Sequence, residues 1–320
     1  MARSVSAADV ARLAGVSGQT VSRVANGAAN VDPTTRARVE AAMAELGYRP
    51  NRAARALRTG RTRTIGVLVR TLATVGNARV LEAVVAAGAA RDHAVLVLTL
   101  ADDTPGSAQA AFAALSDHRV DGAIALNEAT PTVRAAGAAA FPLVAVDSAP
   151  APGLIAIESD HAGGAAAAVA RLRDAGHATV HHLAGPAGSY AADERERGWR
   201  EALGAPAPEP LRGDWSARSG YERGVALAAD PEVTAVFAGN DQMALGLLRA
   251  LREAGRPDVA VIGFDDVVDA ADYQPPLTTV AQDFDALGDA AVALLIDRLE
   301  GRPVPERTVI PTRLVARASG

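Results

Sequence analysis

The chain has 320 residues, of which 49% are hydrophobic and 22% are charged. This composition is typical of a folded protein of about two domains and excludes a disordered chain. There is no cysteine, which excludes disulfide bonds and thiolate metal sites and is typical of a reducing compartment. The apolar stretches fall short of the ~18 residues that a membrane span needs, and the N-terminus lacks the apolar segment of a secretory signal. We therefore expect a soluble, cytoplasmic protein with no membrane partner.

Charge is distributed unevenly along the chain. Residues 1–63 contain eleven arginines and four acidic residues, a net charge of +7, so the remaining residues carry −12 of the total charge of −5. A basic N-terminal segment ahead of an acidic body is frequent in proteins that bind nucleic acid. On charge alone, a solvated basic surface is an equal alternative.

A short helix is predicted at the N-terminus. Ser6 and Asp9 form an approximate capping box that would begin it. Its apolar face is predicted to hold Val10, Leu13 and Ala14.

A tight turn and a second helix follow. Gly15 suits the end of the first helix, and Ser17 can cap the second. The second helix is predicted over residues 18–25, with its two valines turned inward. The side chains left outside are those of Gln19, Thr20, Ser22 and Arg23.

A third helix is predicted from Pro33, with Asp32 as its cap, to about Leu46. Val39 and Met43 recur with Leu46 at helical spacing and would be buried. A helix, a turn of about four residues and a second helix with small polar residues outside form a helix-turn-helix pattern. The pattern alone also fits an ordinary helical hairpin.

Residues 50–58 form an arginine-rich segment with helical character, and a polar connector follows them. A domain boundary is therefore expected near residues 60–64.

From residue 64 onward, short β-branched runs alternate with alanine-rich helical stretches. Two successive series of this kind predict doubly wound parallel sheets, with ligands bound beyond the carboxyl ends of the strands. The first series comprises Ile65–Val69, Ala94–Leu98, Gly122–Leu126 and Leu143–Val146. The second comprises Ile155–Ile157, Val180–Leu183, Val233–Phe237 and Val259–Gly263.

Several ordered motifs resemble the lac repressor (LacI/GalR) family of transcriptional regulators, and the resemblance covers nearly the whole chain. In the N-terminal part they span residues 9–17, 19–24, 41–46 and 48–52. In the core they span residues 213–217, 240–246, 275–279 and 282–284. The resemblance implies a homodimeric repressor, controlled by a small molecule, with a three-helix helix-turn-helix headpiece. It also implies an α/β core of two doubly wound parallel-sheet subdomains, like periplasmic binding proteins.

The resemblance places the second helix in the major groove of a near-palindromic operator. Gln19 and Arg23 match base-reading positions, and their side chains suit adenine and guanine respectively. Gly18 departs from the pattern, because a large side chain is expected at this base-reading position. Groups suited to phosphate oxygens belong to Ser6, Thr20, Ser22, Asn26 and Tyr48.

Residues 50–58 resemble the family's hinge helix, which folds on binding DNA. Leu57 matches the apolar residue that wedges into the minor groove at the operator centre. Asn51 of the same segment counts among the expected DNA contacts. The alternative for Leu57 is packing onto the core.

Pocket residues for a saccharide effector carry over from the same resemblance. A carboxylate, an amide and a guanidinium supply the donors and acceptors that match a polyol, and aromatic faces suit a pyranose ring. The matching residues are Asp147, Arg195, Trp215, Asn240, Asp265, Gln282 and Phe284.

Two departures concern the effector. Arg70 stands where a small hydroxyl residue is expected, and an arginine in the pocket would favour an acidic sugar. It could instead pair with Asp147 or lie outside the pocket. The pocket asparagine is displaced by one position, to Asn127. A β-galactoside is the leading effector class.

Enzymatic functions find little support. The chain has no lysine and no phosphate-binding glycine loop, and adjacent residues on a strand, such as His181 and His182, point to opposite faces. No cofactor or metal is expected. The alternatives kept open are a regulator whose ligand acts as a corepressor, a periplasmic sugar receptor and a sugar-processing enzyme.

The expected organisation has three parts. Residues 1–49 form the headpiece, residues 50–63 the hinge helix and linker, and residues 64–320 the effector-binding and dimerisation core. The core would divide into an N-subdomain and a C-subdomain. Their expected bounds are 64–158 with 282–308, and 159–281 with 309–320. Without a leucine-heptad tail after the core, a dimer is expected.

Overall fold

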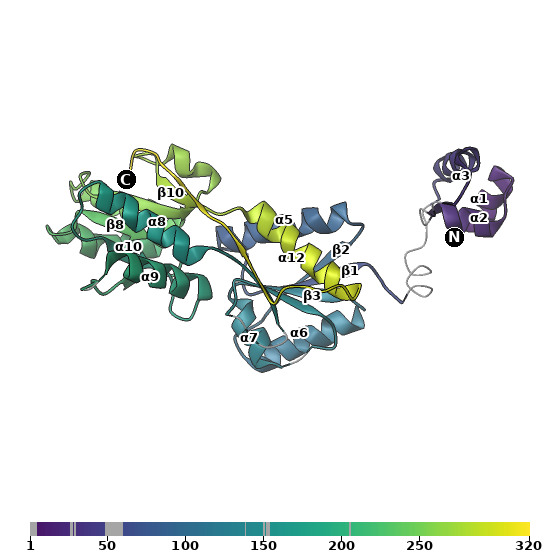
Figure 1. Cartoon of the computed structure of the whole chain (residues 1–320), viewed down its shortest axis with the longest axis horizontal. Coiled ribbons are helices and arrows are strands. Elements are labelled where there is room, and N and C mark those ends of the chain that lie inside the picture. The colour runs from purple at the N-terminus through teal and green to yellow at the C-terminus, as the bar shows by residue number, and fades with distance from the viewer. Residues whose placement is uncertain are drawn as a thin grey trace. The chain divides into compact units, whose positions relative to one another are not determined.

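The computed structural model describes residues 5–25, 28, 30–48, 60–137, 139–149, 151, 154–204 and 206–320. The chain divides into two compact units, Met1–Thr62 and Arg63–Gly320, whose elements are labelled in Figure 1.

The smaller unit consists of three helices around an apolar core. All three contribute buried side chains to this core, among them Val10, Val21 and Val39. The helices are α1 (Ala7–Ala14), α2 (Gly18–Ala25) and α3 (Pro33–Leu46).

Side-chain caps fix where the first two helices begin. The backbone N–H and the hydroxyl of Ser6 donate to the Asp9 carboxylate at 3.0 and 2.6 Å. The N–H of Thr20 donates to Ser17 Oγ at 3.1 Å. Gly15 ends α1 with a φ of 63°, in the left-handed region that favours glycine. The predicted capping box, turn and second cap are thus confirmed.

One predicted core residue lies elsewhere. Leu13 is 47% exposed, whereas Val10 and Ala14 are buried. Ala11 takes the inward position, because residues three and four apart share a helix face. The prediction of a buried Leu13 is therefore wrong.

The first sheet of the larger unit has six parallel strands in the order β11-β5-β4-β3-β1-β2. Along β1, Ile65 and Val67 pack against α5 and α12, whereas Leu68 packs against the cluster that includes α6. Helices therefore cover both faces (Figure 1). The strands are β1 (Thr64–Val69), β2 (Ala94–Thr99), β3 (Gly122–Leu126), β4 (Leu143–Val146), β5 (Ile155–Ser159) and β11 (Arg307–Ile310). The helices are α5 (Val75–Ala90), α6 (Pro105–Asp117), α7 (Ala129–Ala135) and α12 (Phe284–Leu299).

The second sheet has the order β12-β10-β9-β8-β6-β7, in which β12 alone runs antiparallel to its neighbour. Val236 and Val261 pack toward α10 and α11, and Phe237 and Ile262 pack toward α8 and α9. The strands are β6 (His181–Ala184), β7 (Leu211–Arg212), β8 (Ala235–Ala238), β9 (Ala260–Asp265), β10 (Thr278–Ala281) and β12 (Arg313–Val315). The helices are α8 (His161–Asp174), α9 (Tyr190–Leu203), α10 (Ala217–Ala229), α11 (Asp241–Glu253) and the 3₁₀ helix η1 (Val268–Asp272).

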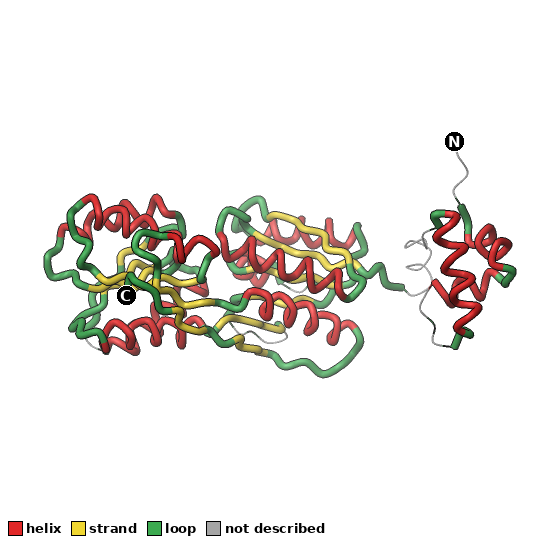
Figure 2. The backbone as a smooth tube through the Cα atoms, turned by 90° about the horizontal axis from the view of Figure 1, so that it is seen from above, coloured by secondary structure: helices red, strands yellow, loops and turns green. Residues whose placement is uncertain are grey.

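The chain passes between the two sheets after β5, after β10 and after β11. Figure 2 shows each sheet with helices on both of its faces. The predicted fold is therefore confirmed: a helix-turn-helix unit is followed in the sequence by two doubly wound parallel sheets.

Two details of the strand prediction differ from the structure. The strand at Ile155 begins the second predicted series, but β5 pairs with β4 and so completes the first sheet. Strands β7, β10, β11 and β12 were not predicted. Three of them lie at sheet edges, and the strands are only two to four residues long, too short for a clear alternation of apolar and polar residues.

Candidate functional site

A cavity lies within the larger unit. Residues that follow strands of both sheets line it, as expected for ligand sites at the carboxyl ends of parallel strands. The lining consists of Thr74, Gly76, Val80, Asn127, Glu128, Asp147, Ser189, Tyr190, Ala191, Arg195, Trp215, Asn240, Asp265, Gln282 and Phe284.

Strained backbone gathers at this cavity. Asn127, Asp147, Trp215 and Asp265 all have positive φ, at 43°, 50°, 72° and 114°. Non-glycine residues rarely adopt such angles, and the surrounding structure must compensate for their cost. Strain of this kind is common at binding sites, so the backbone supports a functional role for the cavity.

Asp265 ends β9 beside two polar partners. Nε2 of Gln282 donates to Asp265 Oδ1 at 2.7 Å, and a guanidinium nitrogen of Arg195 lies 3.5 Å from the same oxygen. Burial raises the pKa of Asp265, although Arg195 and Gln282 act in the opposite direction. These contacts hold the carboxylate in one orientation at the cavity wall.

Arg195 is a buried cation held from several sides. Its Nε donates to Nδ1 of His161 at 3.3 Å, and its guanidinium carbon lies 3.8 Å from the centre of the Phe264 ring. A second nitrogen donates to the carbonyl of Gly239. Burial lowers the pKa of Arg195, and nearby carboxylates oppose that shift.

Asp147 connects to Arg195 through a histidine. Nε2 of His161 lies 2.9 Å from Asp147 Oδ1, and the N–H of Ser159 donates to the same oxygen at 3.3 Å. Nδ1 of His161 accepts from Arg195, so Nε2 is the ring nitrogen nearer Asp147, where it has no hydrogen-bond partner. The side chains of His161 and Arg195 therefore lie between Asp147 and Asp265.

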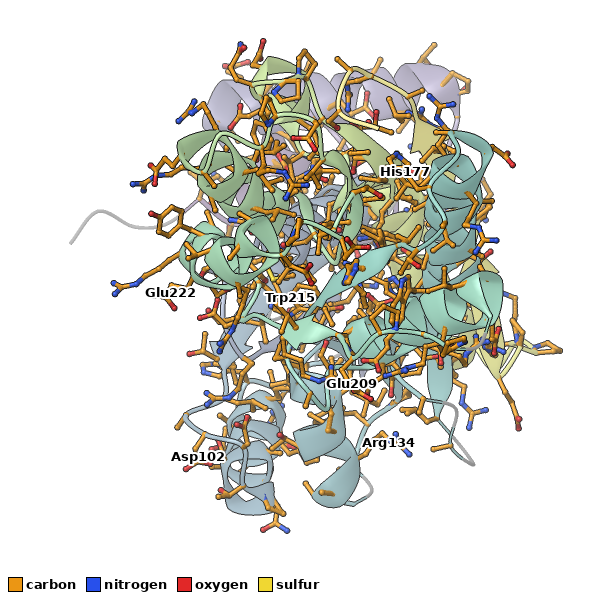
Figure 3. All side chains as sticks on the ribbon, turned by 90° about the vertical axis from the view of Figure 1, so that its left-hand side faces the viewer. Asp102, Arg134, His177, Glu209, Trp215 and Glu222 are labelled. Carbon is orange, nitrogen blue, oxygen red and sulfur yellow. The ribbon has the colours of Figure 1, made fainter. Side chains whose placement is uncertain are left out.

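Trp215 supplies the flat wall of the cavity. Its side chain is buried and packs with core residues of the larger unit. By contrast, Glu222 of α10 points outward (Figure 3). Asn240 supports it from behind: Asn240 Nδ2 donates to the Trp215 carbonyl at 3.0 Å, and Asn240 Oδ1 accepts from Met243 N–H at 2.9 Å. Asn240 thus lines the cavity but also caps α11.

The structure brings most of the predicted effector residues together. The lining includes Asp147, Arg195, Trp215, Asn240, Asp265, Gln282 and Phe284.

Arg70 does not line the cavity. Its Nε donates to Asp103 at 2.5 Å, and another nitrogen donates to the carbonyl of Leu100 at 3.0 Å. This pairing holds the guanidinium beside the residues that follow β2. The structure therefore corrects the expectation that Arg70 faces the effector.

Sequence reasoning missed Glu128, Tyr190 and His161. Glu128 is the second residue after β3, and this position beyond a parallel strand was the available signal. Tyr190 enters the lining from the start of α9, and its hydroxyl donates to the buried Glu158. Asn127, predicted only as a displaced asparagine, lines the cavity.

The exposed face of α2 is the second candidate site. Gly18, Gln19, Ser22 and Arg23 are exposed on it, opposite the buried valines. The guanidinium of Arg23 donates to the Asn30 carbonyl at 2.6 Å. A polar helix face with an amide and a guanidinium has the chemistry that reads base edges in a major groove.

The other predicted DNA contacts are placed in part. Ser6 is half-buried in its capping box, Thr20 shares a 3.0 Å hydroxyl contact with Ser17, and Tyr48 is half-buried against the headpiece core. Asn26, Asn51 and Leu57 lie outside the described residues.

Within the described part of the chain, no cluster of three or more metal-ligating side chains was found. None of the described helices is long and apolar enough to cross a membrane.

Family models match both units of the chain. Residues 7–51 match the model described as bacterial regulatory proteins, lacI family. Residues 169–320 match the periplasmic binding protein-like domain.

Individual relatives extend over almost the whole length. The chain is 36% identical to the lactose operon repressor of Escherichia coli strain K12 over 319 residues, covering 97% of this chain and 89% of the relative. It is 37% identical to the transcriptional regulator CelR of Thermobifida fusca, covering 97% of each.

Solved structures agree. The lac repressor dimer bound to operator and the anti-inducer ONPF matches with a TM-score of 0.83 and 35% identity, covering 99% of both chains. A complex of CelR with cellobiose matches with a TM-score of 0.72 and 33% identity, covering 99% of this chain and 100% of that one. These relatives are transcriptional regulators, not enzymes, and this chain belongs to the lacI family of bacterial regulatory proteins.

Proposed function

We propose that the protein is a transcriptional repressor that binds operator DNA through its headpiece and leaves it when a saccharide occupies the cavity. One observation carries the proposal: buried polar groups and an indole face meet in one cavity lined from both sheets. A ligand that contacts both sheets can change their relative arrangement. Because a ligand shifts an equilibrium only through different affinities for two states, such a cavity suits a switch.

On the DNA side, we propose that α2 reads the operator with Gln19 and Arg23, with Gly18 facing the bases. Ser6, Thr20, Ser22, Asn26, Tyr48 and Asn51 would hold phosphates and set the register. Leu57 would act as the minor-groove wedge. The net charge of +7 over residues 1–63 supports a strong attraction to the phosphate backbone.

We propose the domain organisation that the sequence predicts: a headpiece of residues 1–49, a hinge of residues 50–63 and a core of residues 64–320. The protein would act in the cytoplasm as a homodimer on a near-palindromic site. The similarity to a lac repressor dimer bound to operator supports this assembly.

For the effector, we propose a galactoside-like sugar. Asp147, Asp265 and Gln282 would accept sugar hydroxyls, Arg195 would donate to a pair of them, and Trp215 would stack on the ring. Similarity to a lactose operon repressor supports a galactoside, and similarity to a regulator crystallised with cellobiose supports a β-linked disaccharide more generally.

The test begins with selection of the operator from random duplexes, because its sequence is unknown. Anisotropy titrations of the selected duplex are then repeated with increasing amounts of galactosides, cellobiose and other saccharides. Release of DNA by one of them supports the proposal. Tighter binding would instead support a corepressor, which is the second candidate for the sign of the switch. No effect of any saccharide, with intact operator binding, would contradict a saccharide effector.

A further inference from the structure

Glu128 is a carboxylate of the cavity wall to which the proposed function gives no role. It caps the start of α7 and lines the cavity together with residues of the second sheet. Nδ2 of Asn77 donates to Glu128 Oε2 at 2.8 Å. No ion pair joins Glu128 to an arginine or histidine within the described residues.

Asn77 fixes the orientation of this wall. It is completely buried, and its Nδ2 also donates to the Thr71 carbonyl at 2.9 Å. Both partners of Nδ2 are acceptors only, so Oδ1 of Asn77 must face Asn127 and accept from Asn127 Nδ2. The amide oxygen of Asn127 is consequently left buried without a partner.

A second lining residue, Gln282, repeats this pattern. Nε2 of Gln282 donates to Asp265, which leaves Gln282 Oε1 buried without a partner. Among the described lining residues, two side-chain atoms are buried without a hydrogen-bond partner, Asn127 Oδ1 and Gln282 Oε1. Both are acceptors. A buried acceptor without a donor is unfavourable, so a ligand rich in donors would be stabilised here.

The charges of the lining point the same way. The described lining contains three carboxylates, those of Glu128, Asp147 and Asp265, and one guanidinium, that of Arg195, which lies 3.5 Å from Asp265. A nearby carboxylate shows the contrast: Glu158, which is buried, accepts from Nε of Arg307 at 2.6 Å. Glu128 is thus a carboxylate of the cavity whose counter-charge the described residues do not supply.

We infer that the effector carries an ammonium group that binds Glu128, so that the natural ligand class is an amino sugar or its glycoside. This inference rests on the proposed saccharide effector. An ammonium has three donors and no acceptor, whereas a hydroxyl brings both. It therefore matches a wall of acceptors with excess negative charge, and its bond to a carboxylate is charge-assisted. A uronic acid would bring a fourth carboxylate into the same cavity and is disfavoured.

The test compares matched ligands on three proteins. Neutral methyl glycosides of galacto, gluco and manno configuration are each paired with their 2-amino and 6-amino derivatives and with their uronic acids. Isothermal titration at about pH 6.5 keeps the amines protonated. The proteins are the wild type, Glu128→Gln and the control Glu201→Gln. Glu201 is ion-paired with Arg197 on the exposed side of α9, so its variant removes an equal charge outside the cavity.

We expect one amino derivative to bind the wild type at least about tenfold more tightly than its neutral parent, and the uronic acid to bind most weakly. Glu128→Gln should abolish that preference. Glu201→Gln should keep the wild-type preference. Thermal melting of all three proteins reports whether the variants fold.

Each result decides something. If neutral glycosides bind and release operator but no amino derivative is preferred, the ammonium inference is wrong and the proposed function stands. A preference that survives in Glu128→Gln overturns the role of Glu128. If no glycoside of any kind binds the wild type or releases operator, the proposed saccharide effector itself fails.

Discussion

The indole of Trp215 rests directly on the backbone of Gly185. A Cβ on Gly185 would lie 2.2 Å from Cη2 of Trp215, closer than real Cβ contacts allow. Gly185 follows β6, and Trp215 holds a φ of 72° in the loop after β7. The position of the Trp215 indole therefore depends on residue 185 being a glycine, which has no side chain.

Gly185→Ala should displace the indole and weaken saccharide binding by about tenfold or more, because precise placement of the stacking face is lost. Operator binding without ligand should remain, because the substitution lies in the core unit. Titration calorimetry with the saccharide that releases the wild type, beside operator anisotropy, measures both effects. Gly106→Ala on α6, where the nearest atom would lie 3.8 Å away, is the control. Unchanged saccharide affinity in Gly185→Ala would contradict a stacking role for Trp215.

Asp265→Asn should uncouple the cavity from DNA release. The substitution keeps the size of the side chain but removes the charge that faces Arg195 and turns one acceptor into a donor beside Gln282. Leaving buried groups unpaired costs ~1–3 kcal/mol, so saccharide affinity should fall about tenfold or more. Operator anisotropy should show normal DNA binding and a lost or shifted response to saccharide.

Arg70→Ser is the matched comparison for that experiment. Arg70 pairs with Asp103 outside the cavity, so its removal should leave the saccharide response as in the wild type. It should also leave the preference between neutral and acidic sugars unchanged. Suppose instead that Arg70→Ser no longer releases operator with saccharide, whereas Asp265→Asn still does. That result would contradict the assignment of Asp265 to the effector cavity and of Arg70 to a position outside it.

The sequence predicts the parts of this site that follow from local rules. Strands rich in β-branched residues end where Asp147 and Asp265 stand, and parallel topology then brings such ends together. The headpiece caps at Ser6 and Ser17 are equally local, since each partner lies three residues away. Short sequence patterns are sufficient to find features of this kind.

Other features depend on partners far apart in the chain. Arg70 turns away from the cavity because Asp103, 33 residues later, binds it. Glu128 is oriented by Asn77, 51 residues earlier. The short edge strand β11 pairs with β5 across about 150 residues. No local pattern specifies these pairings, so the sequence could not place them.

Arg23→Ala should reduce the specificity of DNA binding. A bidentate contact to a base edge contributes about 1–3 kcal/mol of discrimination, so affinity for the selected operator should fall about tenfold or more. Affinity for random DNA should fall much less. Arg38→Ala, an exposed arginine of α3 outside the proposed reading face, removes the same charge and should keep the ratio of specific to non-specific affinity. Equal ratios for the two variants would contradict base reading by Arg23.

Gln19→Ala tests the amide in the same way. Its loss should relax the selection at a single base position, most simply one occupied by adenine. Selection from random duplexes, repeated with the variant, gives the position directly. If the variant selects the same operator sequence as the wild type, with equal stringency at every position, Gln19 does not read a base.

His182 should make the stability of the core depend on pH. Its ring is buried between Trp199 and Phe237, and burial lowers its pKa to about 4. In the unfolded chain the pKa of this histidine returns to about 6.5. Between about pH 6.5 and pH 4 the unfolded state therefore binds a proton that the folded state does not bind, and this difference favours unfolding. The contribution of neutral His182 is therefore complete above about pH 6.5 and is lost as pH falls toward 4, by up to about 3 kcal/mol.

Urea denaturation of the full chain between about pH 7 and pH 4.5 measures this loss. His182→Gln cannot titrate, yet its amide can still donate to the Phe237 carbonyl that accepts from Nδ1 at 2.9 Å. The variant should be less stable at neutral pH, because it loses the ring stacking, but its stability should fall less steeply toward acid. His181→Gln, at the adjacent and only partly buried position, should keep most of the wild-type slope. A slope that is the same in wild type and His182→Gln would show that this histidine does not control the acid sensitivity of the core.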